Sequence, residues 1–259
     1  MSTKHTVLLV GGTGRTGRRV LQQLLDRGIG VRAIVRSKEK LPTEVAGNPD
    51  LTVIEASLPS LRVEELEPLV RGCDAVISCL GHVISFKGIY GAPRDLVWRA
   101  TTGLCRAIEA IQPATPIRFI LMSSVSVHHP ARPEPRRGKL ERAFVAVLRG
   151  LLPPAKDNQR AADFLCNEIG AAVHGAYHPF VQWTVVRPDT LLDGEISEYL
   201  VNEQLVSSLF KPDSTRMANV AHFMCELATN PQTWASWQGK LPVITNLASS
   251  GGSSPKGGV

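Results

Sequence analysis

The stretch TVLLVGGTGRTG, residues 6–17, decides the fold of this chain. Its apolar run, residues 7–10, enters three glycines at the spacing GxxGxxG, and an amphipathic segment follows. A strand that passes through such a loop into a helix is typical of the first unit of a doubly wound sheet. Gly11 permits the tight turn, Gly14 lets a diphosphate approach the backbone, and Gly17 lets the helix pack on the sheet.

Strand-like runs alternate with helical patterns along the rest of the chain. Near-continuous apolar strands separated by helices indicate a parallel sheet buried on both faces, with right-handed crossovers. The sequence therefore predicts an α/β fold built on a doubly wound parallel sheet. The expected strands span residues 6–10, 31–35, 51–55, 75–79, 118–122, 183–187 and 241–245, and the expected helices span residues 15–27, 62–70, 93–111, 155–169 and 219–228.

Two segments interrupt this alternation. Residues 125–154 contain too many prolines for one continuous helix, so we expect a long irregular excursion: Pro130, Pro133, Pro135, Pro153 and Pro154. Residues 189–217 follow the sixth strand at the carboxyl edge of the sheet, and we expect a small cap with one helical stretch near residues 197–210. We expect residues 1–247 to form a single domain and the polar tail, residues 248–259, to be disordered.

Length and composition exclude several classes of protein. The chain has 259 residues, 43% of them hydrophobic, which is enough for one sizeable core. No apolar stretch approaches the roughly 20 residues that span a bilayer, and the first residues lack the pattern of a secretory signal. The five cysteines form no CxxC pair, which favours buried, reduced thiols. We therefore expect a cytoplasmic protein with no membrane partner.

Much of the excess positive charge behind the net charge of +6 lies in residues 132–149. Basic residues outnumber acidic ones there: Arg132, Arg136, Arg137, Lys139, Arg142 and Arg149 against Glu134 and Glu141. The segment carries no recognisable zinc-finger or RNA-recognition motif. We predict a solvated basic loop and helix rather than a nucleic-acid site, and binding of a polyanion is the minor alternative.

The glycine loop at the start of an alternating pattern predicts a dinucleotide site, whose phosphates would bind Gly11, Thr13, Gly14, Arg15, Thr16 and Gly17. The second strand ends in Val35-Arg36-Ser37-Lys38 and has no acidic residue for a ribose 2′-hydroxyl. An arginine in this place neutralises a 2′-phosphate, and Arg15 adds a second guanidinium. The pattern favours NADP(H) over NAD(H), and the alternative is that both arginines are ordinary surface cations.

Two further strand ends are expected to contact the cofactor. Ser57 and Leu58 follow the third strand, where an adenine edge would lie. The fourth strand closes with Cys79, Leu80 and Gly81, where a glycine lets the chain pass the ribose closely. A purely structural turn is the alternative at both ends.

Six motifs taken together resemble a known family. They are VGGTGRTG at the start, AVISCLG, FILMSSVSV and VVRPD at the fourth, fifth and sixth strands, and MANVAHFMCELATN and WQGKLPVITN near the end. The sequence resembles the short-chain dehydrogenase/reductase superfamily, in its atypical, NmrA-like NAD(P)-binding branch, over nearly the whole chain up to the tail. This resemblance implies a Rossmann domain with a small carboxyl-terminal substrate region and a preference for NADP(H).

The resemblance also implies a catalytic serine, tyrosine and lysine, and the sequence carries only part of this set. Ser124 matches the serine by its position after the fifth strand, with Ser123 beside it, but the sequence contains no YxxxK motif. Lys156, on the corresponding helix, is either the cation that holds the nicotinamide ribose or a solvent-exposed lysine. His128 is a candidate proton donor because imidazole titrates near neutral pH, and the alternative is a plain loop residue.

Two more segments are candidates for the nicotinamide and substrate region. Arg187 and Pro188 correspond to a turn that passes near the nicotinamide in the family, and Asp189 stands where glycine is common. A glycine-bearing segment after the fourth strand either lines a substrate pocket or packs onto the core. Three aromatic residues flank it: Phe86, Tyr90 and Trp98.

These observations support functions of different classes. We favour an NADPH-dependent oxidoreductase that acts on a small or medium organic substrate. The missing tyrosine favours the alternative hypothesis of a non-catalytic, NADP(H)-sensing regulatory protein. A third hypothesis is an epimerase or isomerase that uses the nicotinamide transiently. The expected partner is a small-molecule substrate, with a homodimer or a protein partner left open. We expect no metal, because the histidines and carboxylates show no ligand spacing.

Overall fold

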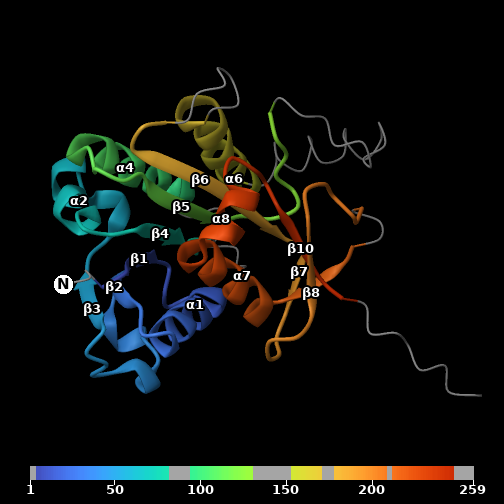
Figure 1. The fold of residues 1–259 in the computed structure, drawn as a ribbon, viewed down its shortest axis with the longest axis horizontal. Helices are drawn as coiled ribbons and strands as arrows, with labels where there is room; N and C mark the ends of the chain where they lie inside the picture. The colour runs from blue at the N-terminus through green and yellow to red at the C-terminus, as the bar shows by residue number, and fades with distance from the viewer. Residues whose placement is uncertain (1–3, 82–93, 131–152, 171–177, 209–211, 248–259) are drawn as a thin grey trace, which may run out of the picture.

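The computed structural model describes residues 4–81, 94–130, 153–170, 178–208 and 212–247. The strands of its main sheet are β1 Thr6–Val10, β2 Gly30–Val35, β3 Leu51–Glu55, β4 Ala75–Ser78, β5 Ile117–Met122, β6 Val181–Pro188, β8 Tyr199–Asn202 and β10 Val243–Asn246. They lie in the order β3-β2-β1-β4-β5-β6-β10-β8 (Figure 1). All neighbours in this sheet are parallel except β10 and β8. The predicted α/β fold with a doubly wound, Rossmann-like sheet is confirmed.

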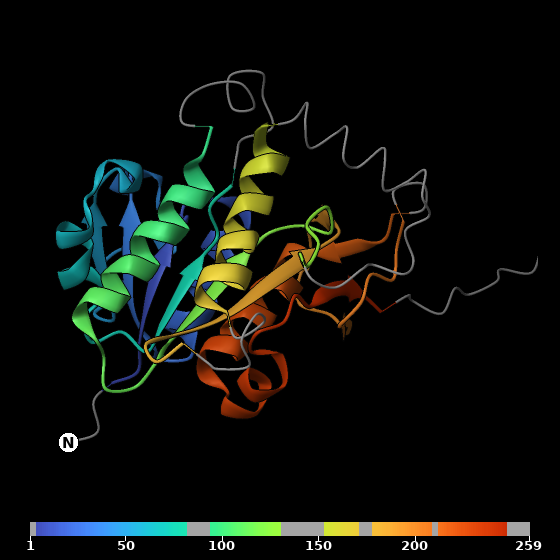
Figure 2. The same cartoon turned by 90° about the horizontal axis from the view of Figure 1, so that it is seen from above.

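Helices cover both faces of this sheet (Figure 2). One face carries α2 Val63–Val70, α4 Leu96–Ile111 and α6 Pro153–Phe164, which continues as a π-helical turn, Leu165–Ile169. The other face carries α1 Arg15–Asp26, α7 Met217–Thr229 and α8 Pro231–Trp237. The α1 helix packs along α7, and α4 packs between α2 and α6. The chain therefore folds into three layers, with the carboxyl ends of the parallel strands at one edge of the sheet.

The apolar strands are near-continuous because both of their faces are buried. Leu8 and Phe119 point into the layer of α2, α4 and α6, whereas Leu9 and Ile120 point into the layer of α1, α7 and α8. All four side chains have an exposed fraction of 0%. Burial of one such side chain contributes about 1.5–3 kcal/mol, so two apolar layers on one sheet hold the strands in register.

The segment predicted as a cap differs from the expectation. The prediction of a helical stretch near residues 197–210 is wrong, because residues 199–202 form the strand β8, which extends the main sheet. The reason is a period of two, because Tyr199 and Val201 pack inward while Leu200 is 48% exposed. The short strands β7 Thr190–Leu192 and β9 Ser214–Arg216 form a second, parallel pair beside it.

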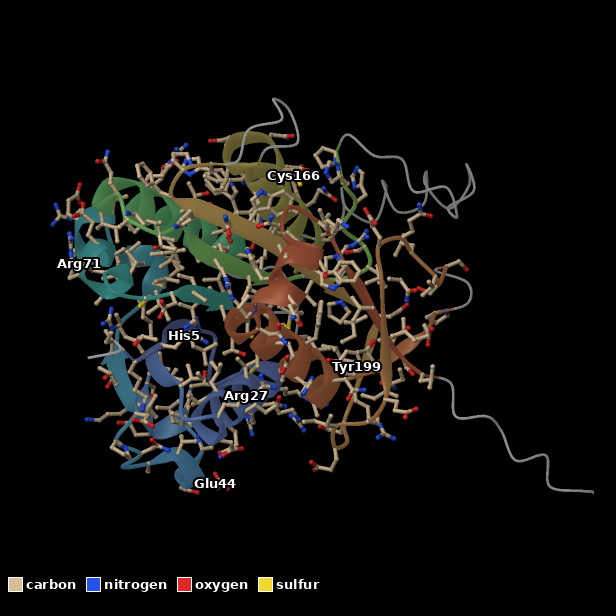
Figure 3. The ribbon with its side chains drawn as sticks, in the orientation of Figure 1. His5, Arg27, Glu44, Arg71, Cys166 and Tyr199 are labelled. Carbon is tan, nitrogen blue, oxygen red and sulfur yellow. The ribbon has the colours of Figure 1, made fainter. Side chains whose placement is uncertain are left out.

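A chain of polar side chains ties β8 to the helical layer. The Tyr199 hydroxyl lies 2.8 Å from His222 Nδ1, and His222 Nε2 lies 3.9 Å from Glu226. Arg27, which directly follows α1, completes this set of contacts with a 2.8 Å ion pair to Glu226. Figure 3 labels Arg27 and Tyr199. Burial raises the pKa of Tyr199 to about 12 and lowers the pKa of His222, so this contact is made by a neutral phenol and a neutral imidazole.

Sequence reasoning missed α8 and could have found it. Asn230 accepts hydrogen bonds from the backbone amides of Gln232 and Thr233, and Pro231 occupies the first helical position. An asparagine followed by a proline is a helix-start signal. Several predictions lie outside the described residues: most of the irregular excursion, the basic segment 132–149, Phe86, Tyr90 and the tail 248–259.

Candidate functional site

The glycine loop is held by backbone contacts that exclude a side chain. Gly11 has φ +80°, and a Cβ atom there would lie 2.6 Å from the carbonyl group of Cys79 at the end of β4. A Cβ atom on Gly17 would lie 2.1 Å from the carbonyl oxygen of Gly11. The close contact of Gly17 is therefore with the loop itself rather than with the strands of the sheet. Both glycines are required for the loop to reach α1 in this shape.

The third glycine, Gly14, lies exposed at the start of α1. The first helical hydrogen bond runs from the Arg18 amide to the Gly14 carbonyl at 2.9 Å, so the preceding amides of Arg15, Thr16 and Gly17 have no acceptor within the helix. No acidic residue lies in the first turn and no side chain caps it. These amides without a helical acceptor and the helix dipole together fit an anionic group such as a diphosphate.

The two arginines predicted to bind a 2′-phosphate are placed differently. Arg15 is paired with Asp193, which lies just after β7, at 3.0 Å, and Arg19 pairs with the same carboxylate at 2.6 Å. Arg36 is exposed after β2, and no side chain or carbonyl group of the described residues binds it. Of these two arginines, Arg36 is therefore the one that can turn to a phosphate without breaking a contact within the described residues.

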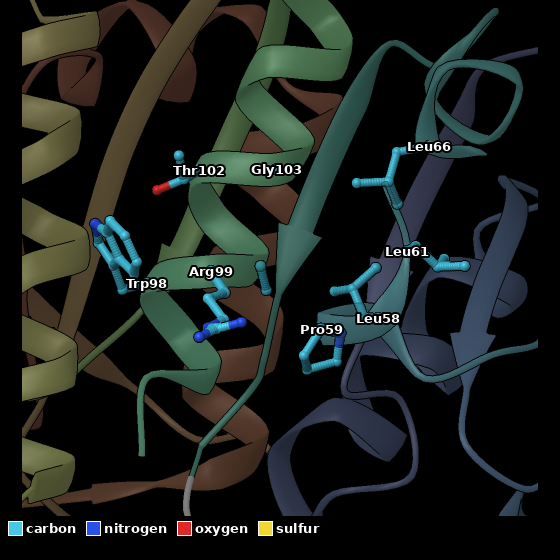
Figure 4. Close-up of a pocket in the computed structure, with 9 residues that line it drawn as sticks. Leu58, Pro59, Leu61, Leu66, Trp98, Arg99, Thr102 and Gly103 are labelled. Atoms are coloured by element: carbon cyan, nitrogen blue, oxygen red, sulfur yellow. The ribbon is translucent and has the colours of Figure 1, made fainter. Parts of the chain in front are cut away.

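A pocket of about 410 Å³ lies between the turn after β3 and α4 (Figure 4). Leu58 and Pro59 line one side, and Trp98 and Arg99 line the other. The buried Leu58 lines this space, while Ser57 is exposed. Contact of these two residues with an adenine stays a prediction.

The residues at the end of β4 present their backbone rather than their side chains. The Cys79 thiol is buried in the layer of α1 and α7, which raises its pKa well above the usual range, and only its backbone lies against Gly11. Leu80 packs on the opposite layer. Gly81 is exposed, and a Cβ atom there would meet no described atom within 4 Å. Packing in the described part of the chain does not require that glycine.

Hydroxyl groups gather at the end of β5. The Ser123 amide donates to the carbonyl oxygen of Val186 at 2.8 Å, but its buried Oγ has no hydrogen-bond partner among the described residues. The Ser124 and Ser126 hydroxyls lie 2.7 Å apart. A buried hydroxyl without a partner is costly, and a polar group of a bound ligand at this strand end would satisfy it.

The structure brings His128 together with Gln159, not with Lys156. The His128 Nδ1 atom lies 2.7 Å from Gln159 Oε1, and Gln159 Nε2 donates to the His128 carbonyl oxygen at 3.0 Å. Gln159 has an exposed fraction of 7%, whereas Lys156 is exposed and makes no polar contact within the described residues. Sequence reasoning missed Gln159. Its spacing from two buried residues of the same helix, Ala162 and Cys166, is the signal that places it on the inner face.

Arg187 and Pro188 hold the loop that carries these residues. The Arg187 guanidinium is 2% exposed and donates to the carbonyl oxygens of Leu241 at 2.8 Å, Val127 at 3.0 Å and Glu203 at 3.3 Å. The Pro188 carbonyl oxygen accepts the amide of Val125 at 3.2 Å. The guanidinium thus joins β6 to the β5 loop, to the segment before β10 and to the segment after β8.

Asp189 organises the segment that was predicted to be a cap. Its carboxylate accepts the amides of Thr190 at 2.7 Å and Asp213 at 3.1 Å and the hydroxyl of Ser207. These partners come from both ends of the segment. The aspartate that stands where a glycine was expected therefore closes this segment on itself.

The chain matches, over residues 11–231, a family of proteins described as NAD(P)H-binding. It belongs to this family. An uncharacterized chloroplastic protein of Arabidopsis thaliana is 28% identical in an alignment 228 residues long, which covers 81% of this chain and 73% of the relative. The name of this relative places it in the chloroplast, and the cytoplasmic location expected here stays a prediction.

Two solved structures share the fold of this NAD(P)H-binding chain. The oxidoreductase ylbE of Lactococcus lactis superposes with a TM-score of 0.65 at 20% identity, over 93% of this chain and 91% of the other. A short-chain dehydrogenase/reductase of Veillonella parvula in complex with NADP gives the same TM-score at 13% identity, over 98% and 100% of the two chains.

The described residues include no helix that combines the length and the hydrophobicity needed to span a bilayer. They also contain no group of three or more metal-ligating side chains.

Proposed function

We propose that this chain is an NADPH-dependent oxidoreductase of the atypical short-chain dehydrogenase/reductase type, in the NmrA-like branch, acting on a small or medium organic substrate. The observation that carries the proposal is the open glycine loop followed, at the end of β2, by the exposed Arg36 in place of an acid. A guanidinium there binds a 2′-phosphate, and an acid would repel it. Membership of the NAD(P)H-binding family supports the coarser part of this proposal.

In this proposal the candidate site residues contact successive parts of the cofactor and the substrate along the carboxyl edge of the sheet. The loop from Gly11 to Gly17, with Thr13 and Thr16, holds the diphosphate, and Ser57 and Leu58 lie beside the adenine. The backbone of residues 79–81 and the Ser123 hydroxyl face the ribose and the nicotinamide, and Arg187 and Pro188 shape that end. The bound cofactor supplies a hydride donor or acceptor. Ser124 donates a hydrogen bond to the substrate oxygen, and His128 holds the proton that this oxygen exchanges.

A non-catalytic NADP(H) sensor is the second candidate, because Lys156 is exposed and the chain has no YxxxK tyrosine. The same binding site serves both functions, so binding alone does not separate them. A Ser124→Ala variant that binds NADPH normally but loses at least 10-fold in kcat with a reductase substrate supports the enzyme. A wild-type protein that turns over none of a panel of carbonyl and alkene substrates supports the sensor.

Calorimetric titration with NADP⁺, NADPH, NAD⁺ and NADH at one salt concentration tests the cofactor. We expect the phosphorylated pair to bind more tightly. Arg36→Ala should weaken NADPH binding by about 10- to 100-fold and leave NADH binding unchanged, because a charge-assisted hydrogen-bond pair is worth about 1.5–3 kcal/mol.

Arg71→Ala is the matched control for this titration. Arg71 is an exposed arginine between α2 and the start of β4, away from the carboxyl ends of the strands that hold the proposed site, and its replacement should change neither affinity. Equal binding of NADH and NADPH by the wild-type protein would contradict the proposed specificity.

A further inference from the structure

The β5 loop and α6 meet through a glutamine whose four hydrogen-bonding positions are all used. Gln159 Oε1 accepts the His128 backbone amide at 3.2 Å and faces His128 Nδ1 at 2.7 Å. Gln159 Nε2 donates to the His128 carbonyl oxygen at 3.0 Å and to Asp163 Oδ1 at 2.8 Å. A buried amide bound in this way has a single orientation.

These partners fix which end of the amide faces the imidazole. The backbone amide of His128 can only donate, so it requires the oxygen of Gln159. The His128 carbonyl oxygen and the Asp163 carboxylate accept, so they require the nitrogen. Rotating the amide by half a turn would set the nitrogen against a backbone N–H and lose all three bonds. The oxygen therefore faces Nδ1, and since an amide oxygen has no proton to give, Nδ1 is the donor.

We propose that Gln159 is a positioning residue that holds His128 in the Nδ1–H form, so that Nε2 is the nitrogen that exchanges a proton with the substrate. The role of Nε2 in proton exchange rests on the proposed function, whereas the tautomer of the His128 ring does not. In the reductive direction, the Nε2–H bond of the imidazolium breaks and an O–H bond forms on the oxygen that gains negative charge. The imidazole stays neutral with its proton on Nδ1, and solvent returns a proton to Nε2.

Other charged groups near this pair do not replace the amide as the partner of Nδ1. Asp163, one turn further along α6, binds the amide nitrogen of Gln159. Asp157, on the same helix, accepts the backbone amides of Val97 and Trp98 at the start of α4. Arg187 reaches the loop at the carbonyl oxygen of Val127, and Lys156 points to solvent. Among these side chains, Gln159 is the one whose polar atom meets His128 Nδ1.

Nitrogen NMR of the ¹⁵N-labelled protein tests the inference directly. The His128 signals are assigned among the seven histidines with a His128→Asn variant. At a pH where the ring is neutral, we expect the Nδ1–H form in the wild-type protein. Gln159→Leu should shift the ring toward the Nε2–H form that histidine prefers in water. Gln159→Glu keeps an oxygen against Nδ1, so its ring should keep the Nδ1–H form, although the second carboxylate oxygen would face the His128 carbonyl oxygen and Asp163 and should lower stability.

Gln182→Leu is the matched control. Gln182 also accepts a side-chain hydrogen bond, from Trp234 Nε1 at 2.8 Å, but on the other side of the sheet. It should lower stability without changing the His128 signals. A wild-type ring in the Nε2–H form, or a Gln159→Leu ring that keeps the Nδ1–H form, would overturn the inference.

Activity separates this inference from the proposed function. We expect Gln159→Leu to lower kcat by about 10- to 100-fold with NADPH affinity unchanged, the range for a misplaced acid-base group. If the NMR signals change as expected and kcat does not, Gln159 positions the ring but His128 is not the proton donor. In that case the assignment of His128 in the proposed function fails while the assignment of Gln159 stands.

Discussion

The glycine loop and the β5 loop lie at the same edge of the sheet but are built in different ways. Backbone contacts hold the glycine loop, where Gly11 and Gly17 leave no room for a Cβ atom. Side chains from distant parts of the chain hold the β5 loop, with Gln159 on one side and Arg187 on the other. A steric limit on the backbone is visible in the sequence as a pattern of glycines. A long-range contact joins two side chains that are far apart in the sequence and form no recognisable pattern.

The largest effect is expected at the glycine loop. In Gly17→Ala the new Cβ atom would lie 2.1 Å from the Gly11 carbonyl oxygen, so the backbone must move. We expect a loss of about 3 kcal/mol in the free energy of unfolding and no measurable NADPH binding. Urea denaturation and calorimetry measure the two effects.

Gly81→Ala is the control for that substitution, because its Cβ atom would meet no described atom within 4 Å. It should unfold at the urea concentration of the wild-type protein. A Gly17→Ala protein of wild-type stability would show that the loop can yield, and the contrast between the two loops would disappear.

The next largest effect is expected at the β5 loop, which side-chain contacts hold in place. Arg187→Met removes the donor to three carbonyl oxygens: the bonds to Val127 and Leu241 are buried, and the bond to Glu203 is partly buried. Each buried group left unpaired costs about 1–3 kcal/mol, and partial relaxation should leave a total loss near 3 kcal/mol or slightly less. Urea denaturation measures it, and the loosened β5 loop should also lower kcat.

Arg36→Met is the matched comparison, because it also replaces an arginine by methionine, but at an exposed position. It should weaken NADPH binding and leave the unfolding transition in place. The opposite result, an unstable Arg36→Met protein and a stable Arg187→Met protein, would reverse the roles assigned to the two arginines.

The smallest effect is expected at the polar contacts that connect β8 to α7 through Tyr199, His222 and Glu226. Burial lowers the pKa of His222 below its ordinary value of 6.5. The unfolded chain therefore takes up a proton at this histidine before the folded chain does, and stability falls as the pH drops below about 6.5. His222 is partly exposed, so we expect a change of a few tenths of a kcal/mol.

Urea midpoints at a series of pH values in wild type and His222→Gln measure this effect. The variant should lose the His222 share of the decline on the acid side. An identical pH dependence in both proteins would show that the imidazole is protonated as easily in the folded chain as in the unfolded one.

Much of the fold could be predicted from local patterns. The strand before Gly11, the helix after it and the other predicted strands were found within two residues of their ends, whereas α4 begins three residues after its predicted start. The error at residues 197–210 arose because burial alternates along β8 while the residue types do not: Leu200 is apolar although it is exposed. Only the pairing of β8 with β10 decides that it is a strand.

The candidate site divides in the same way. The sequence by itself determined the glycine loop, the absence of an acid after β2 and the absence of YxxxK, because each is a property of neighbouring residues. Only the tertiary structure decided that Arg15 pairs with Asp193, that Lys156 faces solvent and that Gln159 holds His128. These contacts join residues far apart along the chain, and the packing of helices and strands, rather than any local preference of the backbone, brings them within hydrogen-bonding distance.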